Sequence, residues 1–205
     1  MRAAVRVHTV RMGYLSIPDP VSDETARSYE IDRARVGYVP NYAKAFAGRP
    51  DVYAAWRGLN GAIKANMPPR TYELATLAAA SRLRSSYCAL AHGQILADDL
   101  IGAPAVEAIM RDSSGAQVPP LDREIMALAD RVAGGAAEIS ETDLQPLRDL
   151  GLTDAEIFDV ILAASARCFF SSVLEASGTE PDAEYASLDP ALREALTVGR
   201  PIAEG

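Results

Sequence analysis

Residues 73–92 read ELATLAAASRLRSSYCALAH and contain one of the two cysteines of the chain, Cys88, and one of its two histidines, His92. These side chains are four positions apart, a spacing that puts them on the same face of an α-helix. Glu73 lies near the start of a strongly apolar helix predicted over 71–83, and a second helix is predicted over 85–100. Both segments are rich in alanine, so we expect them to pack closely.

Proline and glycine residues divide the N-terminal part of the chain. Residues 1–20 alternate apolar and polar side chains and then meet two prolines, which predicts an extended arm. A short helix is predicted from Ser22 to Gly37, and another begins at Pro40. An amphipathic helix follows from Pro50 to the double proline at 68–69.

The segment SSGAQVPP, residues 113–120, is the predicted linker between two halves of the chain. Beyond it, helix starts are predicted at Asp122, Ser140 and Thr153, the last with Glu156 in a capping box. We therefore predict one all-helical domain over 1–205. It consists of an extended arm (1–20), a half with the Glu/Cys/His motif (41–111), a second helical half (122–178) and a C-terminal arm (179–205).

The composition excludes several classes of function. A formal net charge of −8 and a pI near 4.8 are unfavourable for binding nucleic acid or an anionic membrane surface. Two cysteines cannot build a disulfide framework, and free thiols fit a reducing cytoplasm. The basic N-terminus has no apolar run typical of a signal peptide, and no uncharged apolar run of 18 residues occurs. We expect a cytoplasmic protein without a membrane span.

The residues at 73–92 suggest thiol chemistry. Ser85 can cap the second helix through its hydroxyl, which places Cys88 in the first turn, where the helix dipole favours a thiolate. His92 can exchange a proton with the sulfur, and, if protonated, it would favour the thiolate further. Glu73 would orient the imidazole or relay its proton. Such a thiolate attacks a peroxide, a disulfide or an acyl carbon.

Each of these residues also has a purely structural interpretation. A cysteine and a histidine at this spacing arise by chance, and a free cysteine is commonly a small core residue. Cys168 lies in a long apolar pattern and is interpreted as core rather than as a resolving thiol. The only tryptophan, Trp56, is interpreted as a core or interface anchor rather than as a stacking platform for a ligand. His8 is assigned no role. The ligands near Cys88 are too few for a closed zinc site, so no metal or cofactor is expected.

These residues resemble the carboxymuconolactone decarboxylase and alkylhydroperoxidase D-like family, in particular its peroxidase-related branch. The family motif is a glutamate, eleven residues, C-x-x-C, three residues and a histidine; Glu73, Ser85, Cys88 and His92 occupy that spacing. The similarity covers about 35–185, including PDVYAAWRGLN before the motif. It implies an all-helical bundle, usually a trimer or hexamer, with Cys88, His92 and Glu73 as catalytic residues. Ser85 and Tyr87, within the motif, are assigned to binding.

Ser85 departs from the motif because it replaces the cysteine that forms a disulfide with the reactive one. The first hypothesis is therefore an antioxidant, peroxidase-like oxidoreductase that reduces a peroxide through Cys88 and uses an external thiol reductant. The second is a lyase or isomerase that acts on a small carboxylated or lactone substrate through His92 and Glu73. The third is a non-catalytic, helical binding protein.

Overall fold

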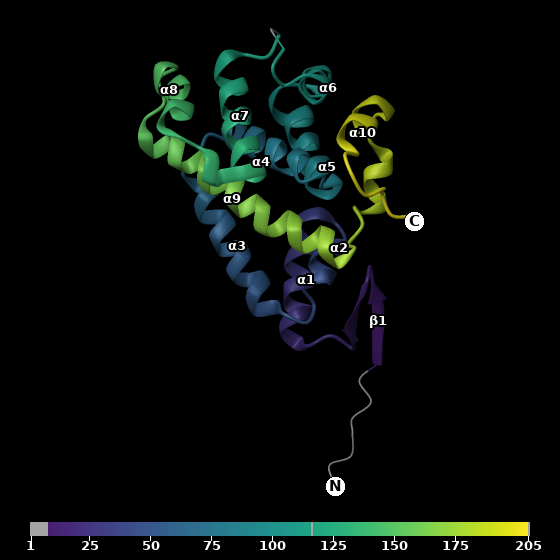
Figure 1. Ribbon diagram of the computed structural model, residues 1–205. Coiled ribbons are helices and arrows are strands. Elements are labelled where there is room, and N and C mark those ends of the chain that lie inside the picture. The colour runs from purple at the N-terminus through teal and green to yellow at the C-terminus, as the bar shows by residue number, and fades with distance from the viewer. Residues whose placement is uncertain (1–7, 116, 205) are drawn as a thin grey trace.

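The computed structural model describes residues 8–115 and 117–204, and helix α9 (Asp154–Ser177) is its central element (Figure 1). A capping box begins α9, with the Thr153 hydroxyl accepting from the Glu156 amide at 3.3 Å and the Glu156 carboxylate accepting from the Thr153 amide at 2.8 Å. Gly178, at φ 74°, ends it. Both ends lie where the sequence predicts them.

Helix α9 is also long and apolar enough to fit a membrane span by length and composition, alone among helices of the described residues. Half of that window is buried within the fold, and α9 contacts α4 (Pro69–Arg82), α7 (Pro120–Gly135) and α3 (Pro50–Ala65). Its apolar surface is thus used in packing against other helices, which is the pattern of a core helix.

Helices α4 and α5 (Ser86–Ile95) form the predicted alanine-rich pair. Every residue of α4 from Tyr72 to Ala80 is buried, because α5, α7 and α9 surround it and its small side chains allow close approach. The predicted break falls at Arg84, whose φ is 55°. Helix α5 continues into the π-helical turn η1 (Leu96–Leu100).

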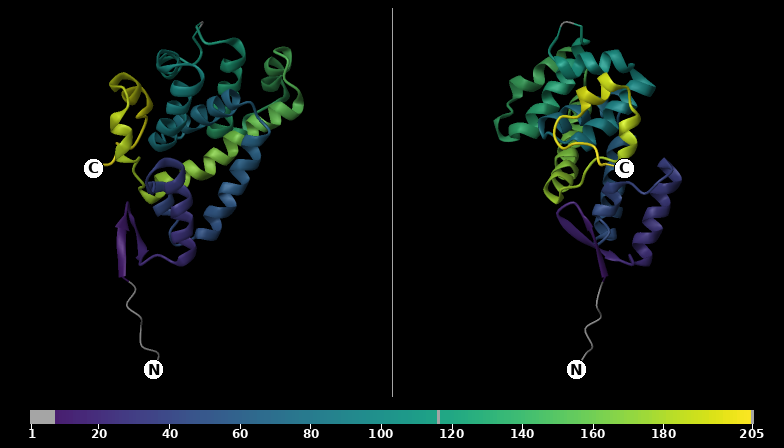
Figure 2. Two further views of the ribbon diagram at one scale, coloured as in Figure 1. Left: turned by 180° about the vertical axis from the view of Figure 1, so that it is seen from behind. Right: turned by 90° about the vertical axis from the view of Figure 1, so that its right-hand side faces the viewer.

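The remaining helices enclose this centre, and two further views show the C-terminal helix α10 beside α5 and α6 (Figure 2). Gly93 of α5 permits this contact, since a Cβ there would lie 2.3 Å from a methyl of Leu196. The other elements are α1 (Asp23–Val36), α2 (Asn41–Ala45), α6 (Ala103–Arg111), η2 (Ala136–Glu138), α8 (Glu141–Asp149), η3 (Ala183–Ser187) and α10 (Pro190–Leu196).

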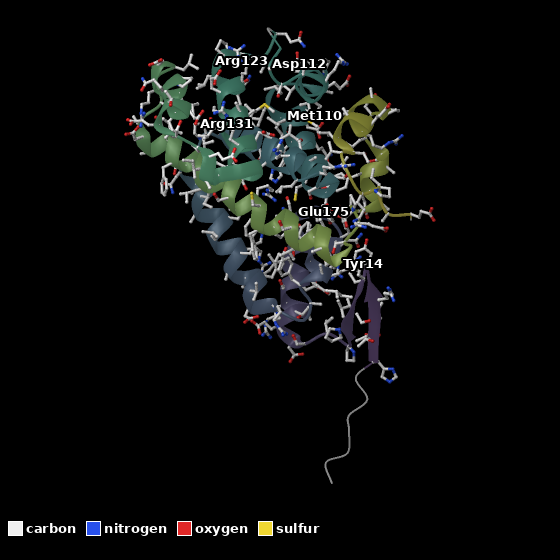
Figure 3. All side chains as sticks on the ribbon, in the orientation of Figure 1. Tyr14, Met110, Asp112, Arg123, Arg131 and Glu175 are labelled. Carbon is white, nitrogen blue, oxygen red and sulfur yellow. The ribbon has the colours of Figure 1, made fainter. Side chains whose placement is uncertain are left out.

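The predicted extended arm is a β-hairpin in its described part, while residues 1–7 lie outside the described residues. Strands β1 (His8–Met12) and β2 (Leu15–Asp19) pair antiparallel, with Val10 opposite Ile17. The hairpin is attached to the end of α9, where the Tyr14 amide donates to the Ser177 carbonyl at 2.8 Å. Figure 3 shows Tyr14 near Glu175, and Arg200 contacts both residues.

Asp122 does not cap α7 as the sequence predicts. The helix begins two residues earlier, at Pro120, whose fixed φ suits the first turn. The Asp122 carboxylate instead accepts from Arg70 Nε at 3.1 Å, which links α7 to the start of α4. The prediction of an all-helical bundle with an extended N-terminal segment is confirmed, and the Asp122 cap is a local error within it.

Candidate active site

Cys88 and His92 both line a cavity of about 370 Å³. They lie on successive turns of α5, and the cavity lining outside α5 comes from α1, α2, α3, α4 and α9. Cys88 is buried, and His92 is only 9% exposed. Six of the sixteen lining residues are aromatic, namely Tyr42, Tyr53, Trp56, Tyr72, Tyr87 and Phe170.

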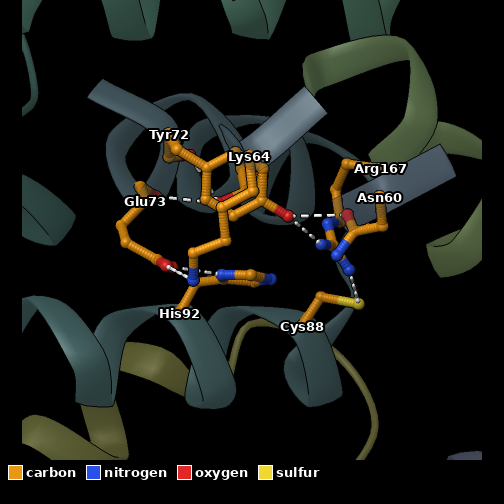
Figure 4. A network of polar contacts seen from close by, with 8 residues as sticks. Asn60, Lys64, Tyr72, Glu73, Cys88, His92 and Arg167 are labelled. Carbon is orange, nitrogen blue, oxygen red and sulfur yellow. Dashed lines mark hydrogen bonds and ion pairs between the residues drawn. The ribbon is translucent and has the colours of Figure 1, made fainter. Parts of the chain in front are cut away.

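Glu73 reaches back from α4 to contact His92, as the sequence analysis required. His92 Nδ1 and Glu73 Oε2 are 2.5 Å apart, and Glu73 is fully buried. The other carboxylate oxygen, Oε1, accepts a hydrogen bond from Lys64 of α3 at 2.9 Å. Figure 4 shows the His92 ring between Glu73 and the side of the cavity that holds Cys88.

The charges of this pair determine which nitrogen of His92 is basic. Burial, together with the nearby Arg167 cation, lowers the pKa of His92 to about 4, so the ring is neutral at pH 7. Burial alone would raise the pKa of Glu73, but the hydrogen bonds from His92 and Lys64 hold it below its ordinary value. An ionised Glu73 accepts the Nδ1 hydrogen, which leaves the Nε2 lone pair of His92 as a proton acceptor.

This buried neutral histidine should make the protein less stable in mild acid. The unfolded chain binds a proton at His92 below about pH 6.5 whereas the folded chain does not until about pH 4, so stability is lost as the pH falls between these values. Relative to His92→Gln, we expect the free energy of unfolding of the wild type to fall by about 2 kcal/mol more between pH 7 and pH 5. Urea unfolding at both pH values measures this, and an equal fall in the two proteins would contradict it.

Arg167 of α9 is the site residue that the sequence analysis missed. Arg167 is 4% exposed, and its Nη1 lies 3.5 Å from the Cys88 sulfur. The Nη2 group donates to the Tyr72 hydroxyl at 3.4 Å, and the guanidinium lies over the rings of Trp56 and Phe170. The sequence signal that could have identified Arg167 is its position as the single charged residue of the apolar run ILAASARCFF.

Arg167 changes the source of positive charge expected beside Cys88. A protonated His92 was one expected source, but burial and the Arg167 cation lower the pKa of that ring to about 4 and keep it neutral at pH 7. Among the described residues, no carboxylate forms a salt bridge with Arg167. An uncompensated buried cation is costly, and the Arg167 guanidinium contacts the Cys88 sulfur and the Tyr72 hydroxyl.

Of the two predicted binding residues, Tyr87 lines the cavity and Ser85 does not. Ser85 precedes α5 at the cap position, but its buried hydroxyl has no hydrogen-bond partner among the described residues and does not line the cavity. The predicted capping bond is therefore wrong. Tyr87 does line the cavity, and its hydroxyl donates to Asp182 and accepts from the Tyr42 amide at 3.2 Å. These bonds fix the Tyr87 ring in the wall.

Of the two residues interpreted as core, Cys168 differs from its interpretation and Trp56 agrees with it. Cys168 follows Arg167 on α9 but is half-buried rather than in the core; both cysteines are free. Burial raises the pKa of the Cys168 thiol, which disfavours its thiolate. Trp56 is buried as predicted and, in addition, lines the cavity. Within the described part of the chain, no group of three potential metal ligands occurs.

Comparison with known proteins identifies the fold. No protein-family model and no curated protein matches the chain, whereas several solved structures do. An uncharacterized peroxidase-related protein from Ralstonia eutropha JMP134, described as an alkylhydroperoxidase AhpD core, has a TM-score of 0.76 and 22% identity over 86% of this chain and 95% of its own. An uncharacterized peroxidase-related protein from Silicibacter sp. TM1040 has a TM-score of 0.75 and 24% identity, over 89% of this chain and 98% of its own.

A third structure with this fold is the debrominase Bmp8, as a cysteine-to-alanine variant in complex with 2,3,4-tribromopyrrole. Its TM-score is 0.68 with 14% identity over 95% of this chain and 97% of its own. The chain thus has an AhpD-like helical fold with a short N-terminal hairpin, and the predicted resemblance is confirmed at the level of the fold.

Proposed function

We propose that the protein reduces a peroxide through the thiolate of Cys88, with His92 and Glu73 as a proton relay. The observation that carries the proposal is the 3.5 Å contact between the Cys88 sulfur and the guanidinium of Arg167. A buried cation favours the thiolate, which is the nucleophilic form of cysteine. The peroxidase-related proteins that share the fold support the same class of chemistry.

The geometry suggests how the proton moves. Nε2 of neutral His92 takes the proton of the Cys88 thiol and leaves a thiolate beside Arg167. The thiolate attacks one peroxide oxygen, so that an S–O bond forms while the O–O bond breaks. His92 returns its proton to the departing alkoxide or hydroxide. The products are a sulfenic acid on Cys88 and an alcohol or water.

An external thiol then has to restore Cys88. Ser85 cannot form a disulfide with it, and Cys88 and Cys168 are both free thiols. One reductant thiol attacks the sulfenic acid and releases water, which forms a mixed disulfide. A second reductant thiol attacks that disulfide, regenerates Cys88 and leaves as an oxidised disulfide. Each peroxide therefore consumes two thiol groups.

The proposal is tested by following peroxide consumption in the presence of dithiothreitol. We expect the protein to consume many equivalents of hydrogen peroxide or cumene hydroperoxide, with one dithiothreitol oxidised per peroxide. The background is the same mixture without protein. Consumption no faster than this background with both peroxides would contradict the proposal.

The aromatic cavity favours a second candidate, which is removal of bromine from a flat ring. Bmp8, the debrominase that shares the fold, was crystallised with a brominated pyrrole. Here the Cys88 thiolate would take bromine from carbon while the carbon takes a proton, and two external thiols would reduce the S–Br group to bromide. Release of bromide from 2,3,4-tribromopyrrole, but no consumption of peroxide, would favour this candidate.

A further inference from the structure

The cavity beside Cys88 is positively charged although the chain has a formal net charge of −8. Its lining includes four cationic side chains and, among the described residues, no acidic one. Two buried carboxylates lie close behind this lining: Asp32 contacts two of the cations and Glu73 contacts Lys64. The cations exceed these carboxylates by two, and by one when the proposed thiolate of Cys88 is counted. The four cations are Arg35, Arg57, Lys64 and Arg167.

Two of these cations have donor groups that the protein leaves unused. Arg167 Nε is buried without a hydrogen-bond partner among the described residues, and the same holds for Arg57 Nη1. The contact of Arg57 with Asp32, at 3.9 Å, is an ion pair that is too long for a hydrogen bond. Buried donors without partners are rare and costly, so these two guanidinium groups, which belong to residues of the cavity lining, keep hydrogen-bonding capacity that the described residues do not use.

The walls define the shape of an acceptor for these groups. Trp56 and Phe170 stack with ring centroids 4.7 Å apart, and the Tyr53 ring supports the Arg57 guanidinium at 4.7 Å. A cavity of about 370 Å³ is near the lower end of the range for small-molecule sites. It has room for a molecule with one ring rather than for a long acyl chain.

We propose that the cavity binds an aromatic carboxylate, with the ring against the aromatic wall and the carboxylate accepting from Arg57 and Arg167. This proposal rests on the proposed function and specifies its substrate, which is an organic hydroperoxide whose carbon skeleton is an aromatic acid. The carboxylate satisfies the unused donors and offsets the excess positive charge. The ring brings the peroxide group to Cys88.

Trp56 makes the proposal testable without catalysis, because it is the only tryptophan and it lines the cavity. Its fluorescence is titrated in the wild-type protein with benzoate and with benzamide, which has nearly the same shape but no charge. We expect benzoate to bind at least about tenfold more tightly, as a charge-assisted hydrogen bond implies. Equal affinity for the two probes, or no binding of benzoate, would overturn the proposal.

A pair of variants tests the assigned donor. Arg57→Gln should weaken benzoate binding about tenfold or more and leave benzamide binding unchanged, whereas Arg49→Gln, at an exposed residue just before α3, should change neither. Unchanged benzoate binding in Arg57→Gln would contradict the assignment. The wild-type comparison of the two probes decides the proposal even if a variant does not fold.

The two proposals fail separately. If benzoate does not bind but hydrogen peroxide still oxidises Cys88, the substrate class is wrong and the peroxidase function stands. If benzoate binds as expected but peroxide leaves Cys88 unchanged, the anion site stands and the peroxidase function is wrong. Neither measurement depends on the other, because benzoate carries no peroxide and hydrogen peroxide carries no ring.

Discussion

Replacement of Cys88 by alanine is expected to lower thiol-dependent peroxide consumption by roughly 10³-fold or more, as loss of a catalytic nucleophile does. Cys88 is the thiol that faces both His92 in the cavity and Arg167. The matched control is Cys168→Ala, which removes the other thiol and should keep activity within about twofold, since an external thiol restores Cys88. The initial rate of peroxide loss at saturating dithiothreitol measures both variants.

Cys88→Ala and His92→Ala together separate the peroxidase from the lyase or isomerase of the second hypothesis. In a lyase, His92 and Glu73 do the chemistry while Cys88 is part of the wall. The lyase would be favoured if the protein acted on a lactone substrate, and if His92→Ala abolished this activity while Cys88→Ala only weakened it. We expect instead that Cys88→Ala loses activity on peroxide and that His92→Ala reduces it.

Replacement of Arg167 by methionine is expected to slow the reaction of Cys88 with peroxide by about thirtyfold or more. A charge pair near 4 Å contributes roughly 4 kcal/mol at an effective dielectric constant of 20, and half of this changes a rate by about thirtyfold. Methionine approximates the length of the side chain without its charge. Arg167→Lys keeps the charge but loses the planar fork, so it should retain part of the rate.

A stability measurement separates this effect from unfolding. Arg167 lies among Trp56, Tyr72 and Phe170, where an apolar side chain can replace a buried charge with little loss of stability. We expect Arg167→Met to unfold in urea close to the wild-type midpoint. A variant that is folded and still reacts with peroxide at the wild-type rate would show that Arg167 does not activate Cys88.

Much of the fold follows from local sequence signals. The caps at Thr153 and Gly178 and the break after α4 involve residues close in sequence, and the structure places each where these signals predict it. The helix start at Asp122 was wrong because its carboxylate binds Arg70, which is distant in sequence. The hairpin was not predicted because the alternation of apolar and polar residues in 1–20 does not show which strands pair. It also does not show that the hairpin attaches to α9.

The candidate site was predictable where it depends on helical spacing. Cys88 and His92 share a face of α5, and the contact of Glu73 with His92 follows from two consecutive packed helices. Arg167 was not predictable because it lies 79 positions from Cys88 and reaches it only through the packing of α9 against α5. Its role depends on burial, which sequence alone did not indicate for a charged residue.

If Cys88 is the peroxide-reactive thiol, its sulfenic acid can be trapped as soon as it forms. The wild-type protein is treated with one equivalent of hydrogen peroxide and dimedone, and the label is located by peptide mass spectrometry. We expect near-stoichiometric label on Cys88, little on Cys168, and loss of this label in Arg167→Met at short reaction times. Label on Cys168 alone, or no label on either cysteine, would contradict it.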